Sequence, residues 1–317
     1  MANVNLPKSW YPAALSKQVG KAPHAFEMFG AEYVLFRGQS GRVSAIERFC
    51  AHMGADLSRG RVVDDGLQCP LHGWTYDSDG GCAFLEAAKQ SSKGRLDALA
   101  THETGGIVFA WPGKEPDWPF PDLPNLKSPR AARPRVETLP CPLVAIGLNG
   151  FDIWHYGIVH RRKVRPGAAT SSTMPHHLGL NFTADVLPGK AYDNLLIKLG
   201  YGELSVRLDY WGGNLILVRN QSGGYLALIA LRPHGESHCQ IYLGVFAEER
   251  STLAGRVILN LLLEVFREVA WRFLQSDVPM VTDMRPRDGV LVAGKDDIAA
   301  EFWRWWKLLP RLDGEVL

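Results

Sequence analysis

Two short Cys–His sequences lie in the N-terminal third of the chain. Cys50-Ala-His52 is followed, after sixteen residues, by Cys69-Pro-Leu-His72, so each loop offers one thiolate and one imidazole. Cys₂His₂ sets are common in structural zinc sites, but zinc patterns usually keep like ligands together. Loops that mix the two ligand types favour a [2Fe-2S] cluster with thiolates on one iron and imidazoles on the other, which also raises the reduction potential.

A second candidate metal site lies in the segment 149–160. His155 and His160 are five residues apart, and Asp152 precedes His155 by three. Five residues of a regular helix turn through about 500°, so a helix must end or bulge between the two histidines if both bind one metal; Gly157 is a permissive place for this. Two histidines and a distant carboxylate form the facial triad of non-haem Fe(II) oxygenases. For this segment alone, two unrelated histidines near a helix end are the alternative.

Taken together, the two motifs resemble those of Rieske non-haem iron oxygenase α subunits. The sequence His72-Gly-Trp74 continues the second loop as in Rieske domains, although Met53-Gly54 stands where an Arg-Gly pair is often seen. An Asn-x-x-Asp-x-x-His-x-x-x-x-His motif then follows in the expected order. The resemblance covers most of the chain and implies an N-terminal Rieske [2Fe-2S] domain followed by a helix-grip catalytic domain. It implies four cluster ligands: Cys50, His52, Cys69 and His72.

The resemblance also implies roles for the residues of the second motif. His155 and His160 bind a mononuclear Fe(II), and Asn149 lies beside it. Asp152 bridges electron flow from a neighbouring subunit's cluster by hydrogen bonding to a cluster histidine and to an iron-ligating histidine. The third ligand is expected near the end of a long C-terminal helix, where Asp277 matches the family position best.

Asp283 is the second choice for this third ligand. It lies near Arg285 and Arg287, where an ordinary ion pair would explain it. For both aspartates, a surface carboxylate at a helix terminus is the alternative reading.

The elements that must hold the first motif are short strands. Residues 32–37, 41–47 and 106–111 alternate strand-forming runs with turn residues, which predicts a small all-β unit. Nine prolines between Pro112 and Pro142 exclude a helix or a central strand there and predict a stiff extended connector. We therefore expect a Rieske domain over residues 1–120, a Pro-rich connector over 121–140 and a catalytic domain over 141–317.

The second half of the chain predicts an antiparallel sheet and one long helix, which makes the fold class α+β. The expected strands are joined by short Gly-bearing turns and span residues 203–210, 214–219, 225–231 and 239–246. Apolar residues recur at four-residue steps over 253–274, which predicts an amphipathic helix. The side chains expected in its buried stripe are Val257, Ile258, Leu261, Leu262, Val265, Phe266, Val269 and Phe273. The side chains expected to face water are Arg256, Asn260, Glu264, Arg267 and Glu268.

Composition excludes several classes of protein. The chain has 35 basic and 33 acidic side chains, which argues against nucleic-acid binding. The longest stretch without charged residues, 166–184, is polar, so no membrane span is expected. Without a secretory signal, a cytoplasmic location is expected by default. The five cysteines do not form a disulfide framework, and Cys82, Cys141 and Cys239 are expected to be core thiols.

Three further clusters have ordinary interpretations. The basic run Arg161–Arg165 is expected to be a solvated surface, with docking of an acidic electron carrier or binding of an anionic substrate group as alternatives. The aromatic run Phe302–Trp306 is expected to pack in a helix or a subunit contact, with stacking on a substrate as the alternative. His176 and His177 are expected to be exposed in a loop, with a mobile entrance as the alternative.

The resemblance predicts a terminal oxygenase that hydroxylates or oxidatively demethylates a small, mostly apolar substrate. The sequence shows no nicotinamide or flavin fingerprint, so we expect a separate NAD(P)H-dependent reductase or ferredoxin. The short catalytic part resembles that of single-subunit-type monooxygenases and demethylases, and the family implies a head-to-tail homotrimer. The rival functions are a ring cis-dihydroxylating dioxygenase and a non-catalytic Rieske carrier or zinc-stabilised binding module.

Overall fold

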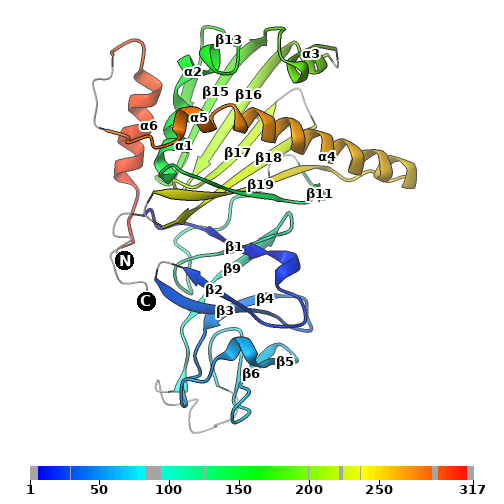
Figure 1. Ribbon diagram of the computed structural model, residues 1–317, viewed down its shortest axis with the longest axis vertical. Helices are drawn as coiled ribbons and strands as arrows, with labels where there is room; N and C mark the ends of the chain where they lie inside the picture. The colour runs from blue at the N-terminus through cyan, green and yellow to red at the C-terminus, as the bar shows by residue number, and fades with distance from the viewer. Residues whose placement is uncertain are drawn as a thin grey trace. The chain divides into compact units, whose positions relative to one another are not determined.

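The computed structural model describes residues 6–28, 30–82, 94–123, 126–198, 200–220, 224–235, 237–287 and 292–312 (Figure 1). The chain forms two compact units. Unit 1 contains the described residues up to Phe120 together with Arg311 and Leu312, and unit 2 runs from Pro121 to Pro310. Each unit has its own sheets and its own candidate metal site.

Unit 1 is built from three small antiparallel sheets. Their orders are β1-β10-β9, β2-β3-β4-β8 and β5-β6-β7. The strands are β1 (Tyr11–Leu15), β2 (His24–Met28), β3 (Ala31–Arg37), β4 (Val43–Glu47), β5 (Arg61–Val63), β6 (Gly66–Gln68), β7 (Thr75–Tyr76), β8 (Ala98–Leu99), β9 (Thr101–Thr104) and β10 (Ile107–Ala110), with 3₁₀ turns η1 (Ser16–Gln18) and η2 (Leu57–Arg59). The three predicted strands are thus confirmed as β3, β4 and β10, and the unit is all-β as expected.

Unit 2 contains a nine-stranded antiparallel sheet with the order β11-β19-β18-β17-β16-β15-β13, in which β12 also pairs with β19 and β14 with β15. The strands are β11 (Pro129–Ala131), β12 (Arg135–Leu139), β13 (Arg162–Val164), β14 (Ala169–Ser171), β15 (His177–Val186), β16 (Glu203–Trp211), β17 (Leu215–Asn220), β18 (Tyr225–His234) and β19 (His238–Glu248). The four predicted strands are confirmed as β16 to β19, and the α+β fold class is confirmed.

The proline-rich stretch contains more structure than an extended connector. Residues 129–139 form β11 and β12, which both pair with β19 at the edge of the sheet. An edge strand tolerates proline because one row of its backbone groups needs no partner strand. The prolines therefore exclude a central strand, as expected, but they allow strands at the edge of the sheet.

The helices of unit 2 are α1 (Leu143–Phe151), α2 (Ile153–Ile158), α3 (Ala191–Lys198), α4 (Leu253–Gln275), α5 (Val278–Val281) and α6 (Asp297–Leu308). The predicted long helix is α4, which crosses the sheet in Figure 1. In α6, Phe302 is buried and stacks on Phe151 and Tyr210, which confirms helix packing for the aromatic run. No helix among the described residues is long and apolar enough to cross a membrane.

The N-terminal half of α4 is exposed on both sides: Arg256, Asn260 and Glu264 face water as predicted, but the apolar stripe is not buried. Val257, Leu261 and Val265, expected in the buried stripe, are 53%, 65% and 46% exposed. The polar side lies against the arginines of the β11–β12 edge, where Glu268 pairs with Arg135 at 3.3 Å, Glu264 accepts from the Arg133 backbone and Asn260 accepts from Arg130. Periodicity correctly predicted the helix, but the charges of the neighbouring strands decide which side faces them.

Candidate metal centres

The two Cys–His loops of unit 1 fold alike. The backbone N–H of Gly54 donates to the Cys50 carbonyl at 2.8 Å, and that of Gly73 donates to the Cys69 carbonyl at 3.1 Å. Both glycines have positive φ, 72° and 74°, which side chains with a Cβ rarely adopt. The thiols are buried whereas His52 and His72 are exposed. Each loop therefore presents an inner sulfur and an outer imidazole.

Like ligands from the two loops lie next to each other. The rings of His52 and His72 are 4.7 Å apart, and Trp74 stacks on His52. Burial raises the pKa of the Cys50 thiol, and the adjacent Cys69 thiol raises it further. Among the described residues, the only His/Cys/Asp/Glu group whose donor atoms all lie within 4.8 Å of one another is in unit 2, so these four donors do not surround one point. Paired thiols beside paired imidazoles suit a two-iron cluster better than a single tetrahedral zinc.

Tyr76 is a contact of this site that the sequence did not reveal. Its hydroxyl lies 3.1 Å from the Cys50 sulfur and accepts from the Ala51 backbone N–H, also at 3.1 Å. Burial, followed by the Cys50 contact, raises the pKa of Tyr76, which keeps the hydroxyl protonated. The proton of Tyr76 is therefore available to the Cys50 sulfur.

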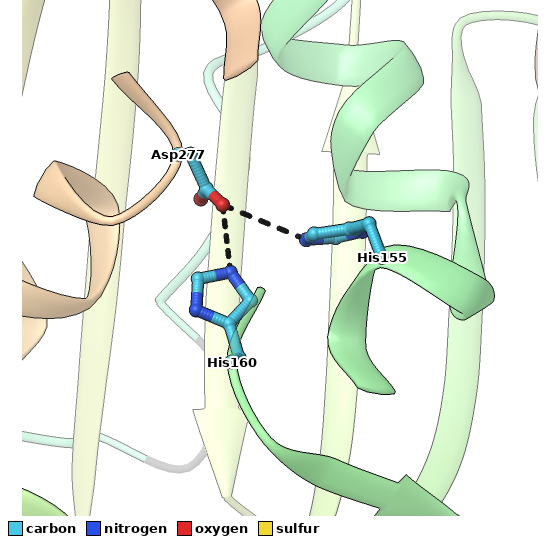
Figure 2. A group of neighbouring side chains, drawn as sticks. All are labelled: His155, His160 and Asp277. Carbon is cyan, nitrogen blue, oxygen red and sulfur yellow. Dashed lines mark ion pairs between the residues drawn. The ribbon is translucent and has the colours of Figure 1, made fainter. Parts of the chain in front are cut away.

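Unit 2 brings His155, His160 and Asp277 together (Figure 2). The Asp277 Oδ1 atom lies 2.8 Å from His160 Nε2 and 3.7 Å from His155 Nε2. All three side chains are buried. Although Nε2 of His160 and Oδ1 of Asp277 are close, they are among the buried atoms without a hydrogen bond in the described part of the chain. Buried polar atoms that converge in this way fit a metal ion held by two imidazoles and one carboxylate.

Local structure fixes the two histidines. Helix α2 carries His155 and ends at Ile158, and Arg161 then has a φ of 56°, so the chain leaves the helix before His160. The helix thus ends between the histidines as predicted, but it passes through Gly157 and ends one residue later. The His160 ring stacks on Phe273 of α4 at 3.6 Å.

The backbone of Asp152 orients His155. Its carbonyl bonds to His155 Nδ1, while its carboxylate caps α2 by accepting from the Trp154 N–H. Burial lowers the pKa of His155. A neutral imidazole held at Nδ1 presents Nε2 as a ligand atom, and the Asn149 amide lies 3.4 Å from that Nε2.

The two carboxylates considered from the sequence are placed very differently. Asp277 follows α4 and begins α5, where its carbonyl accepts from the Met280 and Val281 N–H groups. Asp283 is exposed, and its backbone N–H donates to the Pro140 carbonyl. The geometry favours Asp277 over Asp283.

Two ordinary interpretations of the sequence fail at one residue each: Arg161, Lys163 and Arg165 are exposed as expected, but Arg162 and His177 are not. Arg162 is buried, not solvated: it donates to the His160 carbonyl at 2.8 Å and pairs with buried Asp193 of α3 at 2.7 Å. His177 is also buried, at the start of β15, where it contacts Asp209 at 3.0 Å. Both pairs join residues about thirty positions apart, for which sequence periodicity contains no information.

A cavity opens beside the three residues of Figure 2, between the sheet and α4. Its volume is about 200 Å³, and it is open to solvent at one side. His155, Asn149 and Asp277 lie in its wall, and most of the remaining lining side chains are aliphatic or aromatic. A largely apolar cavity with a few polar groups at one place is the usual form of a small-molecule site.

Residues 9–103 match the family model described as the Rieske [2Fe-2S] domain. Aminopyrrolnitrin oxygenase PrnD of Pseudomonas fluorescens is 34% identical over 131 residues, which are 38% of this chain and 36% of that protein. The oxygenase component of 3-ketosteroid-9-alpha-monooxygenase of Mycobacterium tuberculosis is 26% identical over 323 residues, 95% of this chain and 81% of that protein. The N-terminal unit is a Rieske [2Fe-2S] domain, and the chain is similar along its length to Rieske-type oxygenases.

The match to several of these relatives is partial. The matched part of the chain spans 36% of PrnD and 32% of chlorophyllide a oxygenase of Arabidopsis thaliana. Solved structures agree along the whole chain: dicamba monooxygenase has a TM-score of 0.65 at 18% identity over 96% of this chain and 97% of that one. NdmA of Pseudomonas putida CBB5 has a TM-score of 0.64 at 17% identity, covering 95% and 89%. At such identity these structures establish the fold.

Proposed function

We propose that the protein is a terminal oxygenase. It takes electrons from a separate reductase through a Rieske cluster to a mononuclear Fe(II) site and uses O₂ to hydroxylate or oxidatively demethylate a small, mostly apolar substrate. The observation that carries this proposal is the convergence of three buried donor groups, two of which lie in the wall of an apolar cavity, in a chain that also contains a Rieske domain.

In this proposal each metal has its own ligands. Cys50, His52, Cys69 and His72 hold the cluster, and their arrangement as two like pairs supports this. The trio His155, His160 and Asp277 holds Fe(II), supported by their distances and burial. Two histidines and one carboxylate leave coordination positions open.

The side chains around these metals prepare the reaction. When bound, the cluster supplies single electrons and the mononuclear iron supplies the chemistry of O₂. Asn149 lies beside His155 at the cavity, and the apolar wall excludes water from the substrate. Asp152 links the two centres of neighbouring subunits in a head-to-tail homotrimer, as the family resemblance implies.

The electrons come from outside the chain. An NAD(P)H-dependent reductase or ferredoxin supplies them to the cluster, whose histidine ligands His52 and His72 are exposed in the single chain. The five cysteines are free and buried, which suits the reducing cytoplasm that we propose as the location.

Monooxygenation is favoured over ring cis-dihydroxylation. The relatives include proteins named as monooxygenases, among them 3-ketosteroid-9-alpha-monooxygenase and dicamba monooxygenase. A non-catalytic electron carrier would need neither the buried trio nor the cavity beside it.

The test begins with protein purified without oxygen. We expect about three irons per chain, little zinc and the reduced Rieske EPR signal of mixed thiolate and imidazole ligation. Incubation with ¹⁸O₂, a reductase and candidate substrates should give products with a single labelled oxygen atom. His155→Ala should abolish product and retain the EPR signal, while the matched Asp283→Ala should retain both product formation and the EPR signal.

The outcomes separate the rival functions. Two labelled atoms in a cis-diol would establish a dioxygenase. Zinc without visible absorbance would exclude an oxygenase. If the protein holds two irons per chain and added Fe(II) does not raise this number, the function would be that of an electron carrier.

A further inference from the structure

The wall that the sheet presents to the cavity has two polar side chains at one end. On strands β15 to β19, every other described lining residue is apolar: Phe182, Ala184, Leu204, Val206, Leu208, Ile216, Val218, Ala227, Ile229, Ile241 and Leu243. The exceptions are Asn220, the last residue of β17, and Tyr225, the first of β18. Because Arg219 pairs with Leu226, these two residues are neighbours at the same end of the sheet.

Aromatic contacts place this polar end and the trio of Figure 2 against two different turns of α4. Tyr225 stacks on Phe266 at 4.3 Å, and His160 stacks on Phe273 at 3.6 Å. Phe266 and Phe273 are seven residues apart on one continuous helix, which corresponds to about 10 Å of rise. Apolar Val269 and Ala270 line the cavity between them.

The polar end is suited to a neutral acceptor atom. The Asn220 side chain is buried, and its Oδ1 already accepts from the Ser205 N–H at 3.3 Å. Its amide nitrogen and the Tyr225 hydroxyl are donors. The charged side chains of the described lining, Arg162 and Asp277, are close to His160, at the other end. A carboxylate would therefore be buried at the polar end without a cation, which is costly.

We propose that the substrate is an elongated, mostly apolar molecule with a neutral carbonyl or similar oxygen at one end. Asn220 and Tyr225 bind this oxygen, and the carbon that is oxidised lies about 10 Å away, beside His155 and His160. The polar end thereby selects both the substrate and the position of oxidation, because a ligand oxygen in this apolar cavity loses free energy unless it is hydrogen-bonded. The oxidation step of this inference rests on the proposed function, whereas the binding of the substrate oxygen by Asn220 and Tyr225 does not.

Binding of matched compounds tests the proposal without electrons or O₂. The probes are 4-acetylbiphenyl, a rigid ketone of suitable length, and 4-ethylbiphenyl, which has the same skeleton without the oxygen. Calorimetric titration of the anaerobic, iron-loaded protein should show roughly tenfold tighter binding of the ketone. Asn220→Leu should remove this preference while leaving the affinity for 4-ethylbiphenyl within about twofold.

Two further variants protect the test against a folding defect. Tyr225→Phe changes one hydroxyl and should reduce the preference about threefold. Asn260→Leu makes the same change as Asn220→Leu on the outer part of α4, outside the cavity lining, and should keep the full preference.

Several results would overturn the inference: equal affinity of the parent protein for both compounds, binding of neither, or a preference that survives Asn220→Leu and Tyr225→Phe. If the ketone preference behaves as expected but no labelled product forms under ¹⁸O₂, the polar end stands and the proposed oxygenase function fails.

Discussion

The two candidate metal sites differ in the solvent exposure of their ligand side chains. In unit 1 the imidazoles of His52 and His72 are exposed and only the thiols are buried. In unit 2 the side chains of His155, His160 and Asp277 are all buried, next to an apolar cavity. An electron can enter a cluster through an exposed ligand edge, whereas chemistry on an apolar molecule requires that water be excluded. The burial of each site thus matches its proposed task.

The supporting ion pairs follow the same division. Arg162 and Asp193, behind His160, are 3% and 0% exposed. Arg37 and Glu103 of unit 1 form a two-pronged pair of similar length, at 2.7 and 2.8 Å, but are 25% and 32% exposed. Breaking a buried pair leaves a charge without solvent, while a surface pair has water as a substitute. The comparison therefore predicts very different costs for similar substitutions.

The largest effects should come from removing one site while sparing the other. We expect Cys69→Ala to abolish the cluster spectrum and all turnover, but to retain about one Fe(II) per chain, because the trio lies in a separate compact unit. Asp277→Ala should lose that Fe(II) and keep the cluster spectrum, since the ligand set is reduced to two histidines. Metal analysis and EPR of both variants measure this. Loss of both metals in either variant would contradict independent sites.

Residues close in sequence explain why much of both sites could be predicted. Cys50 and His52, or Cys69 and His72, share a loop, and His155 and His160 share a helix end. Asp277 could be named only through the family resemblance, because no periodicity links it to residues more than a hundred positions earlier. The structure brings it to 2.8 Å from His160.

Side-chain direction was harder to predict than element type. Arg162 lies in a run of basic residues that looks solvated, yet β13 places it inward with Asp193 as its partner. In α4 the apolar period predicted the helix to within one residue at its end, but the arginines of β11 and β12 attract its polar side. Such contacts depend on which elements become neighbours, and local sequence does not specify this.

A substitution in the buried ion pair should have the next largest effect. Asp193→Asn leaves the Arg162 charge buried without its counter-charge, which costs about 3–5 kcal/mol. We expect a melting temperature about 10 °C lower. Because Arg162 also holds the His160 carbonyl, affinity for Fe(II) should fall roughly 10- to 100-fold. Calorimetry and metal titration measure the two effects. The control is Glu249→Gln, whose side chain is 31% exposed and pairs with Arg130, and a similar loss there would show that burial is not the cause.

Tyr76→Phe should change the cluster more subtly. Removing a hydroxyl 3.1 Å from the Cys50 sulfur takes away a hydrogen bond that stabilises the more negative, reduced cluster. A hydrogen bond of about 0.5–1.5 kcal/mol corresponds to roughly 20–60 mV for one electron, so the potential should fall by that amount. Redox titration followed by EPR measures it. Tyr11→Phe deletes a buried hydroxyl that donates to the Pro7 carbonyl instead, and should leave the potential unchanged.

The smallest effect should come from the exposed pair of unit 1. The hydrogen bonds from Arg37 hold the pKa of Glu103 below its usual value of 4.5. A lowered folded-state pKa means that the charged form adds stability, fully present above pH 4.5 and lost as the pH falls through the lower, folded-state pKa. Glu103→Gln should therefore cost about 0.5–1 kcal/mol at pH 7, since solvent screens the pair.

The same reasoning predicts the pH dependence of this difference. Thermal unfolding is followed by circular dichroism in steps from neutral to acidic pH. Above the usual pKa of Glu103, the difference in stability between Glu103→Gln and the parent protein should be constant. Below it the gap should narrow, because the parent protonates Glu103 and loses the same interaction. The exposed Asp117→Asn variant, which removes a single-bond partner of Lys8, should show a smaller gap. If Glu103→Gln lost as much stability as Asp193→Asn, water would not replace Arg37 as a partner. The distinction between the ion pairs of the two units would then fail.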